Sequence, residues 1–141
     1  MGHHRDIYDA ANKAWAIGDL EGSLAMYSPD AVLIDPTGEY HGLQAIREHT
    51  AEAFVGFSSI ENETTNLLEC GDSYVAEWRI RMTHSGAIRN PDGTKIPPTG
   101  RTIEFSGCEV GRLDGDHVIY LHGYWDNMAM AVQLGLIPTA E

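Results

Sequence analysis

The sequence has little cysteine, little positive charge and no long apolar run. Two cysteines, Cys70 and Cys108, are too few for a disulfide framework and match no zinc-site spacing, which favours a reducing cytoplasm. No apolar stretch approaches the ~20 residues of a membrane span. The 9 Lys and Arg residues are outnumbered by 21 Asp and Glu residues, for a net charge of −12. Nucleic acids and anionic membranes bind basic surfaces, so we expect neither as a partner.

Length and composition point to one globular domain. The 141 residues, 43% of them hydrophobic, can bury a core without disulfides or metals, and we expect a single domain over residues 1–141. No internal repeat or low-complexity tract divides the chain. No set of His, Asp and Glu residues has metal-ligand spacing, and no glycine-rich phosphate loop is present.

The first part of the chain shows helical periodicity. Apolar residues recur at helical spacing over Asp6–Ile17, and a second short helix is expected over about Leu20–Tyr27. A short apolar strand, Ala31–Ile34, precedes the turn signal Asp35-Pro36-Thr37-Gly38. Residues Leu43 to Phe57 mark a third helix. His41, His49 and His117 are expected at surface or helix positions, and His84 at a strand end in a backbone or turn contact.

After Phe57 the apolar period changes from 3.6 to 2. Strands are predicted over Ile60–Cys70, Ser73–His84, Arg101–Leu113 and His117–Asp126, and a short helix follows the last of them. Residues 85–100 form a loop rich in Pro, Gly and Asn. Helices followed by a run of strands predict an α+β fold, a curved antiparallel sheet with about three N-terminal helices on its concave face.

The last predicted strand carries the most informative pattern. Alternate side chains of a strand share a face, which places Tyr120, His122, Tyr124 and Asp126 together. Aromatic rings, an imidazole and a carboxylate on one face predict a lined cavity, and hence a site of chemistry. His122 could equally be a core histidine with satisfied hydrogen bonds.

A hairpin register extends this face to the preceding strand. A two-residue turn at Asp114-Gly115 would set Phe105 opposite Tyr124 and Glu109 opposite Tyr120. Cross-strand neighbours share a face, so Phe105 and Glu109 are expected in the cavity. Glu109 could orient His122 or could be structural.

Two tryptophans complete the predicted lining. Trp78 belongs to an apolar set that alternates with Glu77, Arg79 and Arg81, and Trp15 lies on the apolar face of the first helix. Either tryptophan could be core rather than lining, as could Tyr120 and Tyr124. A mainly apolar, aromatic cavity suits a small hydrophobic molecule.

Several ordered stretches of the chain resemble the SnoaL-like polyketide cyclase branch of the NTF2-like superfamily. They are Trp15–Leu20, Tyr27–Val32, Asp35-Pro36, Gly42–Arg47, Thr83–Gly86, Ile96–Arg101, Phe105–Gly107, Asp114-Gly115, Trp125-Asp126 and Gln133–Leu136. The resemblance implies a cone-shaped α+β barrel with an internal pocket, which usually forms a homodimer through its sheet. It also implies ring closure by intramolecular aldol condensation, with no metal or organic cofactor. An aspartate at the end of the last strand would act as general acid/base, and Asp126 falls on that position.

The residues are compatible with this chemistry. Burial in an apolar pocket would raise the pKa of Asp126 towards neutrality, and His122 could relay the proton. Asp126 would also serve as the N-cap of the following helix. The sequence therefore predicts a cyclase-like enzyme that acts on a small hydrophobic carbonyl compound. The alternatives are a ligand-binding module without chemistry, or an isomerase, dehydratase or epoxide hydrolase on the same fold.

Overall fold

The computed structural model describes residues 3–90 and 92–137. Its helices are α1 (His3–Ile17), α2 (Leu20–Leu24), α3 (Leu43–Gly56) and α4 (Asn127–Gln133). Its strands are β1 (Tyr27–Asp35), β2 (Gly38–His41), β3 (Phe57–Cys70), β4 (Ser73–His84), β5 (Ile88–Arg89), β6 (Lys95–Ile96), β7 (Thr102–Asp114) and β8 (His117–Trp125). Among these residues, no helix is long and apolar enough to cross a membrane.

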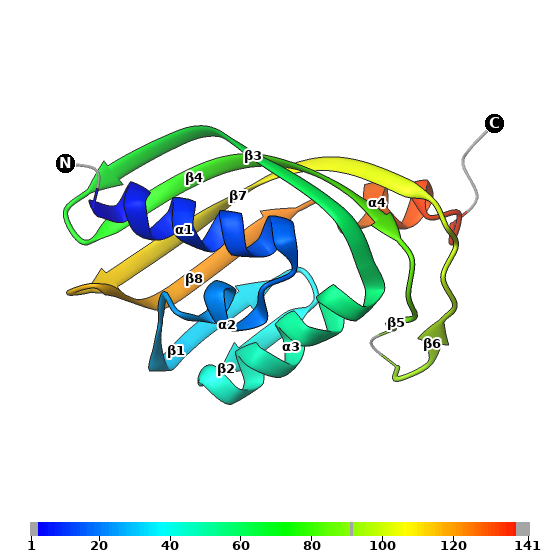
Figure 1. Cartoon of the computed structure of the whole chain (residues 1–141), viewed down its shortest axis with the longest axis horizontal. Helices are drawn as coiled ribbons and strands as arrows, with labels where there is room; N and C mark the ends of the chain where they lie inside the picture. Colours follow the sequence, from blue (N-terminus) through cyan, green and yellow to red (C-terminus); the bar gives the residue numbers. More distant parts are fainter. Residues whose placement is uncertain (1–2, 91, 138–141) are drawn as a thin grey trace.

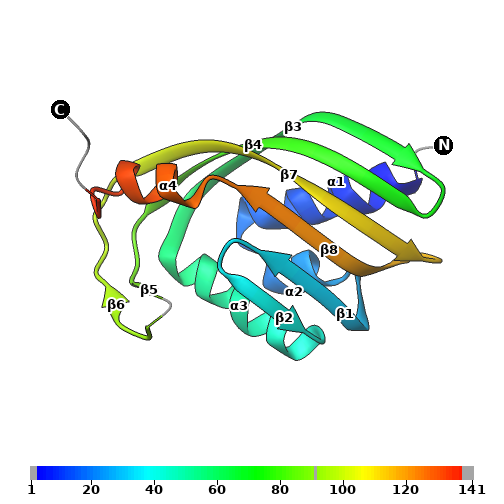
Figure 2. The same ribbon diagram turned by 180° about the vertical axis from the view of Figure 1, so that it is seen from behind.

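The long strands form one curved sheet in the order β2-β1-β8-β7-β4-β3. Neighbouring strands run antiparallel except β1 and β8, which pair in parallel. Helices α1, α2 and α3 lie on one side of this sheet, within its curve (Figure 1). The small β5–β6 hairpin and α4 lie at the far end, as the view from behind also shows (Figure 2). The predicted α+β class, with a curved sheet and N-terminal helices over its concave face, is confirmed.

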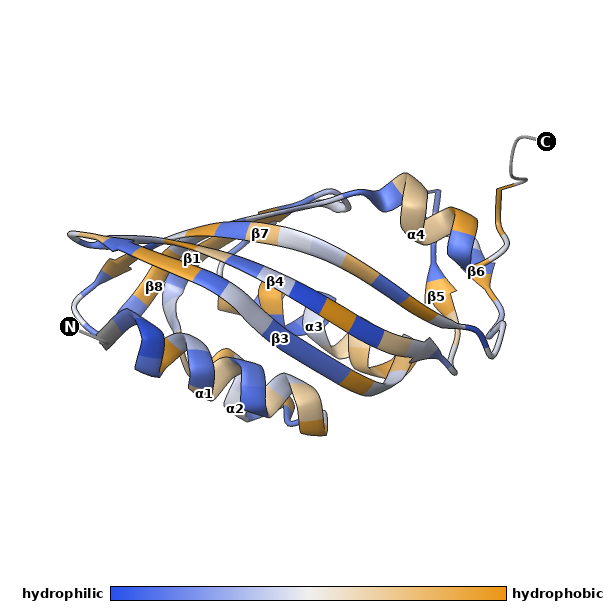
Figure 3. Ribbon diagram, turned by 90° about the horizontal axis from the view of Figure 1, so that it is seen from above, coloured by the Kyte–Doolittle hydropathy of each residue, from blue (hydrophilic) through white to orange (hydrophobic). Residues whose placement is uncertain are grey.

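The strand pattern follows from alternation. Along β4 the even-numbered residues Tyr74, Ala76 and Met82 are buried, whereas Glu77 and Arg79 are exposed. Seen from above, hydrophobic and hydrophilic residues alternate along β4 (Figure 3). The apolar face of β4 is therefore turned to the helices, as the sequence predicts.

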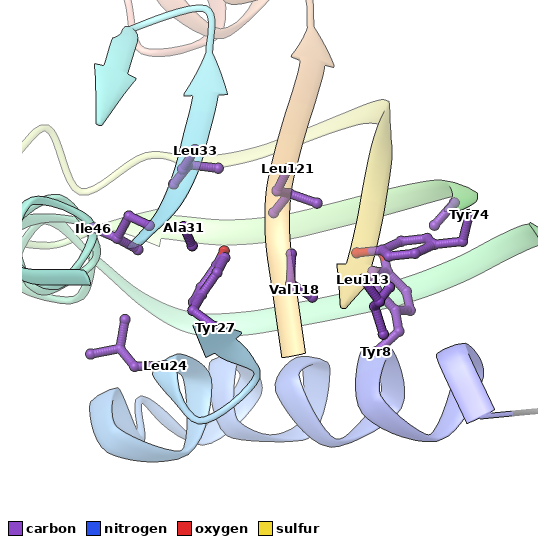
Figure 4. Packing of buried hydrophobic residues seen from close by; sticks show 11 residues of the cluster. Tyr8, Leu24, Tyr27, Ala31, Leu33, Ile46, Tyr74, Leu113, Val118 and Leu121 are labelled. Carbon is purple, nitrogen blue, oxygen red and sulfur yellow. The ribbon is translucent and has the colours of Figure 1, made fainter. Parts of the chain in front are cut away.

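Buried side chains form two clusters. The larger joins α1, α2 and α3 to the sheet and includes Tyr8, Tyr27, Ile46, Tyr74 and Val118. Tyr8 and Tyr74 lie at one end of this cluster, and Tyr27 lies across Val118 from them (Figure 4). The smaller cluster lies towards α4, and Phe57, Ile60, Met82, Ile103 and Leu134 compose it.

Several element boundaries differ from those predicted. Helix α2 ends at Leu24, and β1 already begins at Tyr27, with a register shift between Tyr27 and Val32 where it pairs with β8. Pro29 lies within this irregular stretch. Because proline has no backbone N–H, it cannot donate a hydrogen bond to the neighbouring strand, which fits the interrupted pairing here. Strand β2 and the β5–β6 hairpin were not expected from the sequence. These strands have only two to four residues each, too few for an alternation of apolar and polar side chains to be recognised in the sequence.

Candidate active site

A cavity of about 660 Å³ lies between the concave face of the sheet and helices α1 and α3. Aromatic side chains form much of its wall. Trp78, Phe105 and Trp125 lie within 5.9–6.3 Å of one another, measured between ring centroids. Trp15, which lines the cavity, packs edge-on against Phe54 at 4.7 Å. Trp15, Trp78 and Phe105 therefore lie where the sequence placed them, and their contact with a substrate stays a prediction.

The predicted face of β8 is wrong. The cavity is lined by Leu121, Gly123 and Trp125, while Tyr120, His122 and Tyr124 lie on the opposite face of the sheet. The cause is a register shift between β7 and β8, with Leu113 opposite Val118 but Arg112 opposite Tyr120. Ile119 is the extra residue, a β-bulge, and one extra residue reverses the face of every later side chain.

His122 is instead part of a tyrosine cluster on the convex face. Its Nδ1 lies 3.1 Å from the hydroxyl of Tyr120 and 2.9 Å from that of Tyr124, whose ring stacks on it at 4.0 Å. Val75 and Val110 lie on the same convex face and are partly exposed. The predicted placement of His122 beside a carboxylate in the cavity is therefore wrong. The homodimer through the sheet stays a prediction, and a second copy of the chain would cover this face.

Asp126 is the N-cap of α4. Its Oδ1 accepts a hydrogen bond of 3.0 Å from the backbone N–H of Ala129, and the residue is exposed. The residues on either side, Trp125 and Asn127, line the cavity, whereas Asp126 does not. The capping alternative is confirmed, and the predicted position of Asp126 inside the cavity is wrong because its side chain turns back to the helix.

A different carboxylate lies on the cavity lining. Asp35 ends β1, with only 5% of its side chain exposed, and its Oδ2 lies 2.9 Å from Nε2 of His49 on α3. Its Oδ1 accepts hydrogen bonds from both the backbone N–H and the hydroxyl of Thr37. Tyr40 stacks flat on the His49 ring at 3.9 Å and fixes its plane. The carboxylate is held rigidly by three donors.

These donors decide the charge of Asp35. Burial alone would raise its pKa, but the hydrogen bonds from His49 and Thr37 outweigh burial and hold the pKa below its ordinary value. Asp35 is therefore ionised at neutral pH. Among the described residues, no group of three or more His, Cys, Asp and Glu side chains could hold a metal ion.

The cavity lining also includes two glutamates. Glu52 is exposed and lies 3.6 Å from Arg89, whereas the carboxyl group of Glu109 is buried. The hydroxyl of Tyr74 donates to Oε2 of Glu109 at 3.1 Å, and Tyr8 also hydrogen-bonds to this carboxyl group. Burial raises the pKa of Glu109 to about 7, although the hydrogen bonds from both tyrosines oppose the rise. At neutral pH Glu109 is therefore protonated in a large fraction of molecules and can donate a hydrogen bond.

Gly123 separates the two carboxyl groups. It pairs with Glu109 on one side, and on the other a Cβ added at Gly123 would lie 3.9 Å from the Cβ of Asp35. Adjacent strands lie about 4.8 Å apart, so the backbones of Asp35 and Glu109 are roughly 10 Å apart across β8. Because glycine has no side chain, the cavity reaches the sheet between a carboxylate and a carboxylic acid.

The protonation of Glu109 should make stability depend on pH. Its pKa rises from 4.5 to about 7, so between these values the folded protein binds more protons than the unfolded chain. The stability of the wild type relative to Glu109→Gln should then fall as pH rises from about 4.5 to about 7, by on the order of 3 kcal/mol. Urea unfolding of both proteins from pH 5 to 8 measures this. A constant difference would mean that Glu109 titrates normally.

Sequence reasoning missed Asp35 and His49 as site residues. Asp35 belongs to a turn signal, Asp-Pro-Thr-Gly, and His49 was assigned to a surface or helix position without a role in the site. One signal could have found His49, because it follows the buried Ile46 by three positions and precedes the buried Thr50, which places it beside the inner face of α3. Glu109 was predicted in the cavity, but next to His122 instead of Tyr8 and Tyr74.

Comparison with known proteins identifies a family. The family model described as a SnoaL-like domain matches residues 8–121. No curated protein matches the sequence significantly.

Solved structures show the same fold at low identity. AclR from Streptomyces galilaeus, a candidate hydroxylase, is 19% identical with a TM-score of 0.84, over 100% of this chain and 86% of that chain. A candidate SnoaL-like polyketide cyclase from Jannaschia sp. CCS1 is 18% identical with a TM-score of 0.81, over 96% and 93%. An LEH-like epoxide hydrolase from M. tuberculosis is 14% identical with a TM-score of 0.71, over 92% and 86%. Their different activities show that the fold alone does not select a reaction.

Proposed function

The chain belongs to the SnoaL-like domain family, and on this premise we propose that it is an acid/base enzyme that enolises a carbonyl compound. The substrate is small and largely apolar, as the aromatic lining of the cavity requires. Asp35, held by His49, is the general base. Glu109, which accepts hydrogen bonds from Tyr8 and Tyr74, is the donor to the carbonyl oxygen.

One observation carries this proposal. Two carboxyl groups face one cavity across Gly123, and their surroundings push their pKa values apart, down for Asp35 and up for Glu109. Carboxyl groups with separated pKa values can take the roles of base and acid at one pH. A single carboxyl group, or two with the same charge, would not serve both ends of an enolisation.

The proposed steps balance within the chain and its substrate. The C–H bond next to the carbonyl breaks as its proton moves to Oδ2 of Asp35, and the electron pair passes to the carbonyl oxygen. The O–H of Glu109 donates to that oxygen, where negative charge develops, in a cavity that strengthens the hydrogen bond. The His49 contact and the Thr37 hydrogen bonds hold Asp35 in place during the transfer.

Two fates of the enolate are compatible with this site. It can attack a second carbonyl of the same molecule, which closes a ring by aldol addition, and the alkoxide formed then takes the proton from Asp35. It can instead take the proton back from Asp35 at another carbon, which isomerises a double bond. The polyketide cyclases among the structural neighbours support the first fate as the natural one. Both fates begin with the same proton removal, so one probe can report on either.

The pH dependence of turnover tests the proposal. The probe is allyl naphthyl ketone, whose double bond moves into conjugation after enolisation and changes the ultraviolet absorbance. The wild-type kcat/KM should fall as pH rises through about 7, because Glu109 loses the proton that it donates. Glu109→Gln should lower the plateau and abolish this fall, since an amide donates at every pH.

Two results would contradict the proposal. If kcat/KM of Glu109→Gln still fell as pH rises through about 7, as in the wild type, Glu109 would have no role in the reaction. Wild-type protein that binds the ketone without isomerising it over the whole pH range would instead indicate the ligand-binding module, with Asp35 and Glu109 as polar contacts only.

A further inference from the structure

An asparagine in the cavity has no role in the proposed enolisation. Asn62 on β3 lines the cavity, yet its side-chain oxygen is buried and finds no hydrogen-bond partner among residues 3–90 and 92–137. Buried polar groups in folded proteins are nearly always hydrogen-bonded, so an unpartnered amide on a cavity wall requires an explanation.

The surroundings of Asn62 supply no protein donor. On β3 the inward-facing neighbours are Ile60 and Thr64. The Thr64 hydroxyl accepts from Asn12 at 3.2 Å and hydrogen-bonds to Tyr8. The residue paired with Asn62 on β4 is Ile80, which also lines the cavity. An amide in apolar surroundings is costly to bury unless a ligand group completes its hydrogen bonds.

We propose that Asn62 accepts a hydrogen bond from a hydroxyl or N–H group of the substrate, at the end remote from the reacting carbonyl. The terminal torsion of an asparagine is broad, so the amide can turn towards a bound group. The inference rests on the proposed function and deepens it. The substrate class becomes a carbonyl compound that carries a second, hydrogen-donating polar group.

The sheet register sets the span of such a substrate. Glu109 pairs with Ala76 on β4, and four residues further along β4 Ile80 pairs with Asn62. Four residues of strand and two strand spacings separate the backbones of Glu109 and Asn62 by roughly 16 Å. Both side chains extend into the cavity from the sheet, so the two polar groups of the substrate must be held apart by a rigid apolar body such as a fused ring pair.

The experiment compares three probes by isothermal titration calorimetry. They are acetylnaphthalene, its derivative with a hydroxyl on the far ring, and the methoxy analogue of that derivative, which can accept but cannot donate. The wild type should bind the hydroxyl compound about tenfold more tightly than the other two. Asn62→Leu should bind all three alike, with the affinity for acetylnaphthalene retained. Asn66→Leu is the matched control, because Asn66 lies on the same strand, is exposed and bonds to Glu77 outside the cavity.

The outcomes separate this inference from the proposed function. Equal binding of the three probes to the wild type overturns the role of Asn62 and leaves the enolisation intact, as does a hydroxyl preference that persists in Asn62→Leu. Failure of the wild type to bind any of the probes overturns both. Should Asn62→Leu fail to fold by circular dichroism, the ranking of the probes on the wild type still decides.

Discussion

Replacing Asp35 with asparagine is expected to lower the isomerisation of allyl naphthyl ketone about 10²–10⁴-fold, the range over which a positioned general base accelerates proton transfer. The amide has the shape of the carboxylate and its oxygen can still accept from Thr37, but it cannot take a proton. His49 and Thr37 hold the side chain in place, so the substitution should remove proton transfer without moving the residue. The loss should therefore appear in kcat. Stopped-flow or steady-state absorbance with the same ketone measures it.

Two other aspartates serve as matched controls. Asp126 and Asp19 each cap a helix with an extended backbone and accept from a backbone N–H, and asparagine caps as well as aspartate does. Asp126→Asn and Asp19→Asn should therefore leave the rate unchanged. If Asp126→Asn lost activity and Asp35→Asn kept it, the acid/base role would return to the end of β8.

Filling the space at Gly123 is the second change with a large expected effect. A Cβ at this position would have Trp125 at 3.4 Å and Asp35 at 3.9 Å among its nearest neighbours, so a methyl group fits without moving the backbone. Gly123→Val should place two methyl groups between Asp35 and Glu109, where we propose the carbonyl to bind. We expect kcat/KM for the ketone to fall about a hundredfold or more, because a displacement of the reacting group by about 1 Å has that effect.

Thermal unfolding separates blocked access from misfolding in this experiment. Valine favours strands, and the backbone of Gly123 is not in the left-handed region that requires glycine. The melting temperature of Gly123→Val should therefore match or exceed that of the wild type. Gly123→Ala, with one methyl group, should show a smaller loss of activity. A fully active, folded Gly123→Val would place the reaction elsewhere in the cavity.

Much of the fold was predictable because it depends on local patterns. The helical period of α1 and α3, the alternation of β4 and the turn at Gly115 each lie within one segment, and the structure has these elements with shifts of a few residues. The N-cap role of Asp126 was also open to prediction, since a cap requires only the residue and the helix that follows it.

The site depended on a register that the sequence hides. The run Val118-Ile119-Tyr120-Leu121 is apolar throughout, so nothing in its alternation marks Ile119 as a bulge. That single residue exchanged the faces of β8, which removed His122 from the cavity and brought Gly123 into it. Side chains alternate between the two faces on either side of Ile119. The prediction was wrong because it continued one alternation through this residue.

By itself the sequence determined that the chain forms an α+β fold with an aromatic, mainly apolar interior, and that Trp15, Trp78, Phe105 and Glu109 face it. These results follow from periodicity, which each segment carries alone. Only the tertiary structure decided which carboxyl groups meet. Asp35 and Glu109 are 74 positions apart in the sequence numbering and become neighbours across Gly123 because β1 pairs with β8 and β8 with β7. Strand pairing between distant segments is set by the packing of the whole sheet, and no local pattern encodes it.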